Sequence, residues 1–523
     1  MPIALARGWW RFGYRERGML LLVAVFALLL PLANPRIAAT DEVQYYVYLR
    51  SLRFDGDLDF ANDYQRFAAI NPRAGIEGSL LQPNRIRPAT GRYGNIAPIG
   101  AAIMWAPFFL LADGLVHLAN AFGAGIAADG FSPPYLYAVC YASALYGLLG
   151  LLLSYRLARR YASQFATSLA SLALWLATPL VFYMFVQMAF AHATGFFLVA
   201  LFLTIWQATR ADDRGATTDE RIGRPAARSA DRARSWRAWA ALGFVGGLMT
   251  MTREQLGLFL LVPAIEALVA YRRVWARAGG GAAAGGQAAI ARLAVLAGRH
   301  ALFLAVFLTT LTPQLVVYQV LNGSPRPAGE VSGKLNLCSP HLIDTLIDYD
   351  PRPSAWCGVQ NDPSATFAPF AHGAFVWSPV LVPALAGLAL LWRRDRLAAA
   401  VLGLAFVAQT YINGAFGTTW HLSGAFGFRR LIECTPIFVI GLALVLDWAA
   451  RRVDRRALVG PVALLVAWNA GLVLNWAIFH PELRKGLIWP ELWRWQLEAP
   501  VRLAAQVGDL LFNRCRFVEN SGC

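Results

Sequence analysis

Apolar segments of about 16 to 22 residues recur along this chain, and short arginine-rich stretches separate them. A helix of about 20 apolar residues is long enough to cross the hydrocarbon core of a bilayer. Hydrophobic residues make up 57% of the sequence and charged residues only 15%, which excludes an ordinary soluble enzyme. The pattern therefore predicts an all-α, multi-span membrane protein with about eleven transmembrane helices. The expected spans are 18–38, 133–155, 166–183, 191–208, 237–253, 256–271, 300–320, 375–391, 398–413, 434–449 and 457–477.

The arginines predict which side of the membrane each loop occupies. A net charge of +16 would suggest a nucleic-acid partner in a soluble protein, but here the arginines gather between the apolar segments. Cytoplasmic loops carry such an excess, so no nucleic-acid partner is expected. Lysine occurs only at positions 334 and 485, while arginine and alanine abound, a bias typical of GC-rich bacterial genomes. We expect a bacterial plasma (inner) membrane protein with these stretches in the cytoplasm: the N-terminus, 209–237, 272–299, 393–396 and 451–456.

One apolar segment, 97–118, does not fit a simple crossing. Counting back from the cytoplasmic stretch 209–237 places both flanks of this segment outside, and Pro98 and Pro107 interrupt it. We therefore expect a re-entrant or juxtamembrane helix on the outer face, a cytoplasmic N-terminus and an extracytoplasmic C-terminus. A transmembrane domain of residues 1–477 would then carry two outer loops and be followed by an outer tail: 40–132, 321–374 and 478–523.

Two carboxylates, Asp41 and Glu42, follow the first span directly. Charged groups beside hydrocarbon are costly and commonly functional. Desolvation raises the proton affinity of a carboxylate, which suits a general base for a hydroxyl group. The alternative is capping, with Thr40 as the N-cap and both carboxylates in the first turn of an amphipathic surface helix. The residues alone leave both interpretations open.

Three arginines are expected on the outer side, where the positive-inside tendency does not explain them. Arg253 and Glu254 interrupt two apolar segments, and Arg429 and Arg430 end the outer-loop sequence Phe426-Gly427-Phe428-Arg429-Arg430. Guanidinium groups at this level can hold a phosphate. For Arg253, an ion pair with Glu254 that closes a helical hairpin is the alternative.

Other outer residues are candidates for lining a substrate cavity. Tyr45 belongs to the expected surface helix, and His421 precedes the two arginines in their loop. Tyr93 and Asn95 could line a groove for a lipid-linked substrate or pack a re-entrant segment. His192 begins a span, where a packing role competes with substrate or metal contact.

Nothing in the sequence has the spacing of a metal site. The outer histidines are scattered, and Asp55-Gly56-Asp57-Leu58-Asp59 fails as a calcium loop because Phe60 occupies the glycine position. We expect no cofactor and no metal, with a divalent ion as the less favoured alternative. Two cysteine pairs could close local disulfides in an oxidising compartment, Cys338 with Cys357 and Cys515 with Cys523.

Taken in order, these features resemble the C-type glycosyltransferase superfamily and, within it, the bacterial relatives of protein O-mannosyltransferases and of lipid A aminoarabinose transferases. The resemblance covers about 18–450. It rests on Asp41-Glu42 with the tyrosine-rich helix, Arg253 at the end of a span, and the segments 372–379 and 426–430. It implies transfer of a sugar from a polyprenyl-phosphate donor to a lipid, glycan or protein acceptor on the extracytoplasmic side.

The resemblance also implies roles for single residues. Asp41 would deprotonate the acceptor hydroxyl, with inversion at the anomeric carbon, and Glu42 would orient Asp41 or the acceptor. Arg253, with Arg429 or Arg430, would neutralise the departing lipid phosphate. Members often carry a second acidic residue in the second outer loop. The corresponding residues 184–192 contain none, which favours a metal-independent enzyme.

Two other classes remain as alternatives. A lipid-linked glycan polymerase or ligase would use a large polar outer loop, and 321–374 supplies arginines and histidines for one. A transporter or lipid flippase would show repeated halves and ionisable residues at mid-membrane. No clear repeat is visible, and the carboxylates gather at one face.

Overall fold

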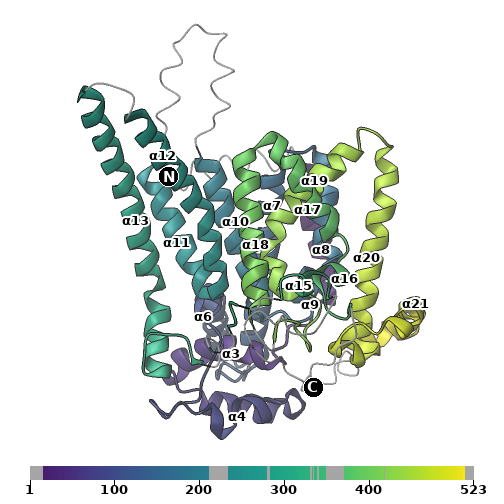
Figure 1. Cartoon of the computed structure of the whole chain (residues 1–523). Helices are drawn as coiled ribbons and strands as arrows, with labels where there is room; N and C mark the ends of the chain where they lie inside the picture. Colours follow the sequence, from purple (N-terminus) through teal and green to yellow (C-terminus); the bar gives the residue numbers. More distant parts are fainter. Residues whose placement is uncertain are drawn as a thin grey trace.

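The computed structural model describes residues 16–210, 234–278, 283–329, 333, 335–338, 341–348, 370–416 and 419–512. Within these residues the chain is helical, and it has no strand beyond one isolated bridge between Ile86 and Tyr93. Long helices stand side by side as a bundle (Figure 1). The protein is an all-α, multi-span membrane protein, as the sequence predicted.

The bundle helices are α2 (Arg17–Leu29), α7 (Pro133–Arg159), α8 (Gln164–Leu176), α10 (Ala191–Thr209), α11 (Trp236–Thr252), α12 (Leu261–Ala278), α13 (Ala283–Asn322), α17 (Leu381–Arg394), α18 (Arg396–Gly414), α19 (Thr435–Ala449) and α20 (Val459–Leu474). Shorter elements and surface helices are η1 (Leu30–Leu32), α3 (Thr40–Arg50), η2 (Ser51–Asp55), α4 (Ala61–Ile70), η3 (Pro72–Ala74), α5 (Ile76–Leu80), η4 (Pro83–Arg85), α6 (Gly100–Ala121), α9 (Leu180–Phe185), η8 (Glu254–Leu260), α15 (Asp344–Ile347), α16 (Ala374–Trp377), η11 (Arg429–Cys434), η12 (Arg455–Leu458), η13 (Asn475–Phe479), η14 (Pro481–Lys485) and α21 (Trp489–Phe512).

Each of the predicted spans contains helical residues. Eight helices in the described ranges are long and apolar enough to cross a membrane. They include α6 and do not include α2, α8, α11 or α17. The count of eleven spans therefore stays a prediction.

The two ends of the bundle differ in chemistry. At one end, Arg159 pairs with Glu16 at 3.0 Å, and Arg210 pairs with Asp395 at 2.8 Å. Arg394 lies 3.6 Å from Asp447 at the same end. We call this the arginine-rich end, and it unites turns that the sequence placed together in the cytoplasm. The opposite end, which we call the cap end, carries α3, α4 and α6 and is the lower end in Figure 1.

Helix α6 begins and ends at the cap end. Its first residue, Gly100, packs against the backbone of Met251 and Thr252 at the end of α11. In its second half, eight residues before its end, Asp113 accepts a hydrogen bond of 2.7 Å from Tyr135 at the start of α7. A helix whose two ends lie at the same end of the bundle does not cross it. This geometry agrees with the re-entrant or juxtamembrane helix expected for 97–118.

The stretch 272–299 was predicted as a cytoplasmic loop, and that prediction is wrong for most of it. Helix α12 continues to Ala278, and α13 begins at Ala283. Alanine is the best helix former, which explains why this alanine-rich stretch extends both helices. Helix α13 has 40 residues, or about 60 Å, and exceeds the thickness of a bilayer core.

Helix α3 is buried, whereas the sequence predicted an amphipathic helix along the surface. Tyr46 and Tyr48 are almost fully buried. The Tyr46 ring meets Phe67 of α4 and Phe109 of α6 edge-on, and the Tyr48 hydroxyl donates to the Ala97 carbonyl at 2.8 Å. Because α4 and α6 cover α3, its first turn is held at a fixed place at the cap end.

Candidate active site

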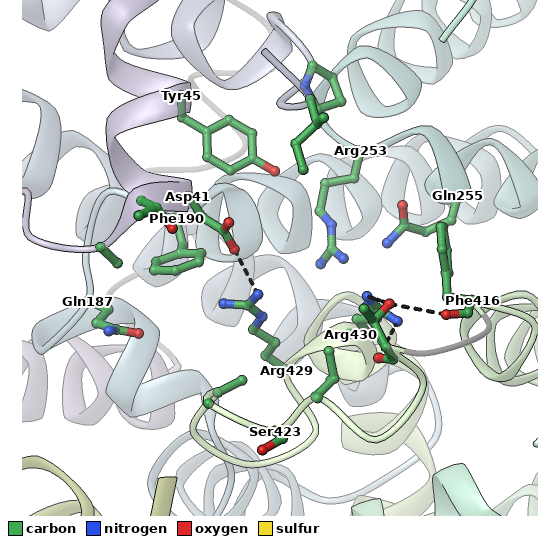
Figure 2. Close-up of a pocket in the computed structure, with 18 of the residues that line it drawn as sticks. Asp41, Tyr45, Gln187, Phe190, Arg253, Gln255, Phe416, Ser423, Arg429 and Arg430 are labelled. Carbon is green, nitrogen blue, oxygen red and sulfur yellow. Dashed lines mark hydrogen bonds and ion pairs between the residues drawn. The ribbon is translucent and has the colours of Figure 1, made fainter. Parts of the chain in front are cut away.

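A cavity of about 440 Å³ opens at the cap end. Its walls come from five parts of the chain: the start of α3, the segment before α6, the turn before α10, the junction between α11 and η8, and the segment that leads into η11. Figure 2 shows Asp41, Arg253, Arg429 and Arg430 around this space. The structure thus brings together four of the residues that the sequence singled out.

Asp41 lies in the first turn of α3 and forms an ion pair across the cavity. Its Oδ2 accepts from Nη2 of Arg429 at 2.8 Å. The Asp41 side chain is 37% exposed, and that of Arg429 is 20% exposed. The Arg429 guanidinium also lies over the Phe190 ring, 4.7 Å from its centroid. Asp41 is therefore accessible from the cavity while one of its oxygens is held.

The other two arginines are held differently. Arg253 follows α11 and lines the cavity. Its Nη1 donates to Oε1 of Glu433 at 2.7 Å, and Glu433 itself is not part of the cavity lining. The alternative interpretation of Arg253, an ion pair with Glu254, is not what the structure shows, since its carboxylate partner is Glu433. Arg430 donates to the carbonyl and hydroxyl oxygens of Thr419, each at 3.1 Å. Both of these partners are neutral. Unlike Arg429 and Arg253, Arg430 forms no ion pair with a carboxylate in the described part of the chain.

Glu42 does not line the cavity. Its Oε2 accepts from the backbone N–H groups of Ala38 and Ala39, at 3.0 and 2.9 Å, and its Oε1 accepts from the Ala189 N–H at 3.2 Å. Burial raises the pKa of Glu42 to about 7, although these three N–H groups oppose the shift. Glu42 closes the N-terminus of α3, where Ala39 rather than Thr40 is the N-cap residue.

Two of the other five predicted residues reach the cavity. Tyr45 points into it (Figure 2), and burial raises the pKa of its hydroxyl to about 12. His421 also lines it, with its Nδ1 accepting from the Ser423 N–H at 2.9 Å. Tyr45 can therefore act as a hydrogen-bonding group but not as a base near neutral pH.

Tyr93, Asn95 and His192 lie outside the cavity wall. The Asn95 amide donates to the Gln44 carbonyl at 2.7 Å and its oxygen accepts from the Ala97 N–H, which fixes the segment before α6. Tyr93 makes the bridge to Ile86. His192 is 3% exposed and contacts Arg253 and Glu433. For Asn95 and His192 the structure shows packing contacts.

Sequence reasoning named Glu254 only as a possible ion-pair partner of Arg253, and it missed other residues of the cavity wall. Glu254 lines the cavity as a second carboxylate and bonds to the Tyr318 hydroxyl. Gln187, Phe190 and Gln255 also line it. The position of Glu254 directly after Arg253 was a signal for it, because both follow the end of the same span.

The described residues of the second polar loop do not line the cavity, but two of its histidines pack beside it. His341 stacks on Trp420 with ring centroids 4.5 Å apart, and the His372 ring lies 5.5 Å from that of His421. Burial lowers the pKa of His372 to about 4. Residues 349–369, which include Arg352 and Cys357, lie outside the described residues, as do Cys515 and Cys523. The two disulfide predictions fall on these residues.

Among the described side chains, no group of three or more His, Cys, Asp or Glu could hold a metal ion. Metal independence stays a prediction.

No protein-family model matches the sequence, and a search of curated proteins found no match. Among solved structures, the chain is similar to ArnT from Cupriavidus metallidurans in the apo state, with 15% identity and a TM-score of 0.44 over 96% of this chain and 78% of ArnT. It is also similar to the oligosaccharyltransferase AglB from Archaeoglobus fulgidus, solved with an inhibitory peptide and a dolichol-phosphate. That match has 13% identity and a TM-score of 0.44 over 93% of this chain and 56% of AglB.

Proposed function

We propose that this protein is an inverting glycosyltransferase that moves a sugar from a polyprenyl-phosphate donor to a hydroxyl group of a lipid, glycan or protein acceptor. The cap end would face the outside of a bacterial plasma membrane. One observation carries the proposal: a carboxylate, Asp41, and three guanidinium groups from distant parts of the chain line a single cavity. The three guanidinium groups are those of Arg253, Arg429 and Arg430.

The chemistry follows from this arrangement of charges. The acceptor oxygen attacks the anomeric carbon from the face opposite the phosphate, and its proton passes to the Asp41 carboxylate. The bond between the anomeric carbon and the phosphate oxygen breaks, and its electron pair leaves with the polyprenyl phosphate. Negative charge therefore grows on the phosphate, where preorganised arginines stabilise it most.

The ion pair between Asp41 and Arg429 fits this reaction. Only Oδ2 of Asp41 is bonded to Arg429, so Oδ1 remains for the acceptor hydroxyl. A phosphate bound to Arg429 would share the guanidinium group with Asp41. The base and the leaving group would then be held by one side chain on the two sides of the reacting carbon.

Release of the lipid phosphate tests the proposal without knowledge of the sugar. Detergent-purified protein is incubated with polyprenyl-phosphate sugars and with an envelope extract that supplies lipid, glycan and protein acceptors, both from bacterial membranes, and free polyprenyl phosphate is measured by mass spectrometry. We expect release by the wild type and not by Asp41→Asn. Turnover in detergent, where no second compartment exists, would also exclude a flippase. Absence of release across the whole donor pool would contradict the proposal.

A further inference from the structure

A buried carboxylate, Glu433, lies behind the cavity and touches none of its open space. It is 1% exposed and is not part of the cavity lining. Its Oε1 accepts from Nη1 of Arg253 at 2.7 Å and lies 3.1 Å from Nδ1 of His192. The same Nη1 of Arg253 contacts the His192 ring. Glu433 of η11 and His192 of α10 thus both contact the same nitrogen, Nη1 of Arg253 at the end of α11.

The opposite edge of the Arg253 guanidinium group is also held. With its amide oxygen turned towards Arg253, Gln255 accepts from Nη2 at 2.5 Å and from Nε at 3.2 Å. Figure 2 shows the two side chains next to each other at the cavity. Arg253 is only 9% exposed. Contacts on both edges leave the guanidinium group little freedom to change its orientation.

A buried carboxylate at this place needs a reason, because desolvating an ion is costly unless it is paired. Three guanidinium groups at one cavity repel one another. Asp41 compensates one of them and Glu433 another. Gly195 of α10 packs closely against this carboxylate, because a Cβ there would lie 3.3 Å from Cγ of Glu433 and 3.1 Å from a methyl group of Leu256.

We propose that Glu433, together with His192, is a positioning residue that holds the Arg253 guanidinium group in the orientation that binds the phosphate of the lipid donor. Glu433 lies on the same short helix, η11, as Arg429 and Arg430. Through Glu433, the position of Arg253 is tied to that of the other two arginines. The inference rests on the proposed function, since it assigns Arg253 to the lipid phosphate.

Direct binding of undecaprenyl phosphate to the protein in nanodiscs tests the inference separately from catalysis. We expect Glu433→Gln to weaken binding by about 10- to 100-fold, because it removes a charged hydrogen-bond partner. The KM for the donor should rise by a similar factor, with kcat changed much less. Glu433→Asp, which keeps the charge on a shorter side chain, should restore part of the affinity, and it replaces Glu433→Gln if that variant does not fold.

A double-mutant cycle with Arg253→Gln separates positioning from general stabilisation. If Glu433 acts through Arg253, the double variant binds the lipid phosphate no more weakly than Arg253→Gln alone. Losses that multiply would overturn the inference.

Glu266→Gln is the matched control. It neutralises a carboxylate that pairs with a buried arginine, Arg234, at 2.8 Å near the arginine-rich end. This variant should bind undecaprenyl phosphate like the wild type. Wild-type binding by a folded Glu433→Gln, beside weakened binding by Arg429→Ala, would refute the positioning role and leave the proposed function standing. No binding by the wild type would refute both.

Discussion

Asp41 and Arg429 are 388 positions apart in the chain, and their side chains form an ion pair of 2.8 Å at the cavity. The first turn of α3 and the start of η11 are thereby joined across the cap end. The predicted base and a predicted phosphate ligand are thus each other's partner.

Asp41→Asn should lower kcat by about 10²- to 10⁴-fold, because a carboxamide cannot take the acceptor proton. Binding of undecaprenyl phosphate should persist or improve, since Arg429 loses its competing carboxylate. Rates of polyprenyl phosphate release and binding constants measure the two effects. Asp59→Asn, an exposed carboxylate further along the same region, is the control and should be neutral. A normal rate in a well-folded Asp41→Asn variant would remove Asp41 as the base.

Arg430→Ala should weaken binding of the lipid phosphate by about 10- to 100-fold, because Arg430 is bonded only to oxygens of Thr419 and its charge is available for an anion. Arg430→Lys should recover only part of the loss, since lysine lacks the planar fork of donors. Binding to nanodisc-embedded protein gives both values. Arg393→Ala, exposed at the opposite end of the bundle, should bind normally. Equal affinity of Arg430→Ala and wild type would exclude Arg430 from the phosphate site.

The raised pKa of Glu42, about 7 instead of 4.5, predicts a pH-dependent stability. Burial favours the protonated form, so the contribution of this group is fully present below pH 4.5 and is lost as the pH rises through 7. The difference amounts to about 3 kcal/mol at most. Melting temperatures in detergent between pH 5 and 8 should fall more steeply for the wild type than for Glu42→Gln. Parallel curves would show that Glu42 is ionised throughout.

Cysteine labelling from one side of the membrane tests the path of α6. Single cysteines at Gln65 and Gly125, which are exposed before and after α6, should react from the same side. A cysteine at Asp454, exposed on the turn after α19, should react only from the other side. The native cysteines are replaced first, because Cys338 is exposed. Labelling of positions 65 and 125 from opposite sides would show that α6 crosses the membrane.

The sequence located Asp41, Arg253, Arg429 and Arg430 because charged residues that end apolar segments must lie at a membrane boundary. Counting the spans then places each loop on one side of the membrane, and residues on the same side can be expected to lie close together. The cavity confirms that these four meet. Their chemical roles remain predictions.

The sequence could not show which side chains are buried in the protein rather than exposed to the cavity. Asp41 and Glu42 are neighbours, but successive residues on a helix point about 100° apart, so one faces the cavity and the other the core. Their positions in the sequence made Asn95 and His192 candidates for lining the substrate cavity. Their contacts depend, however, on how α3, α6, α10 and η11 pack. The pairing of Glu433 with Arg253 joins residues 180 positions apart and has no local signal.

Helix α6 is as long and as apolar as a membrane span, yet both of its ends lie at the cap end. Any topology obtained by counting apolar segments would therefore gain one crossing at this helix and would place every later loop on the wrong side. A reporter fusion that ends before α7 would lack Tyr135, whose hydroxyl donates to Asp113 of α6. The orientation of this chain should accordingly be mapped on the full-length protein rather than on a series of truncations.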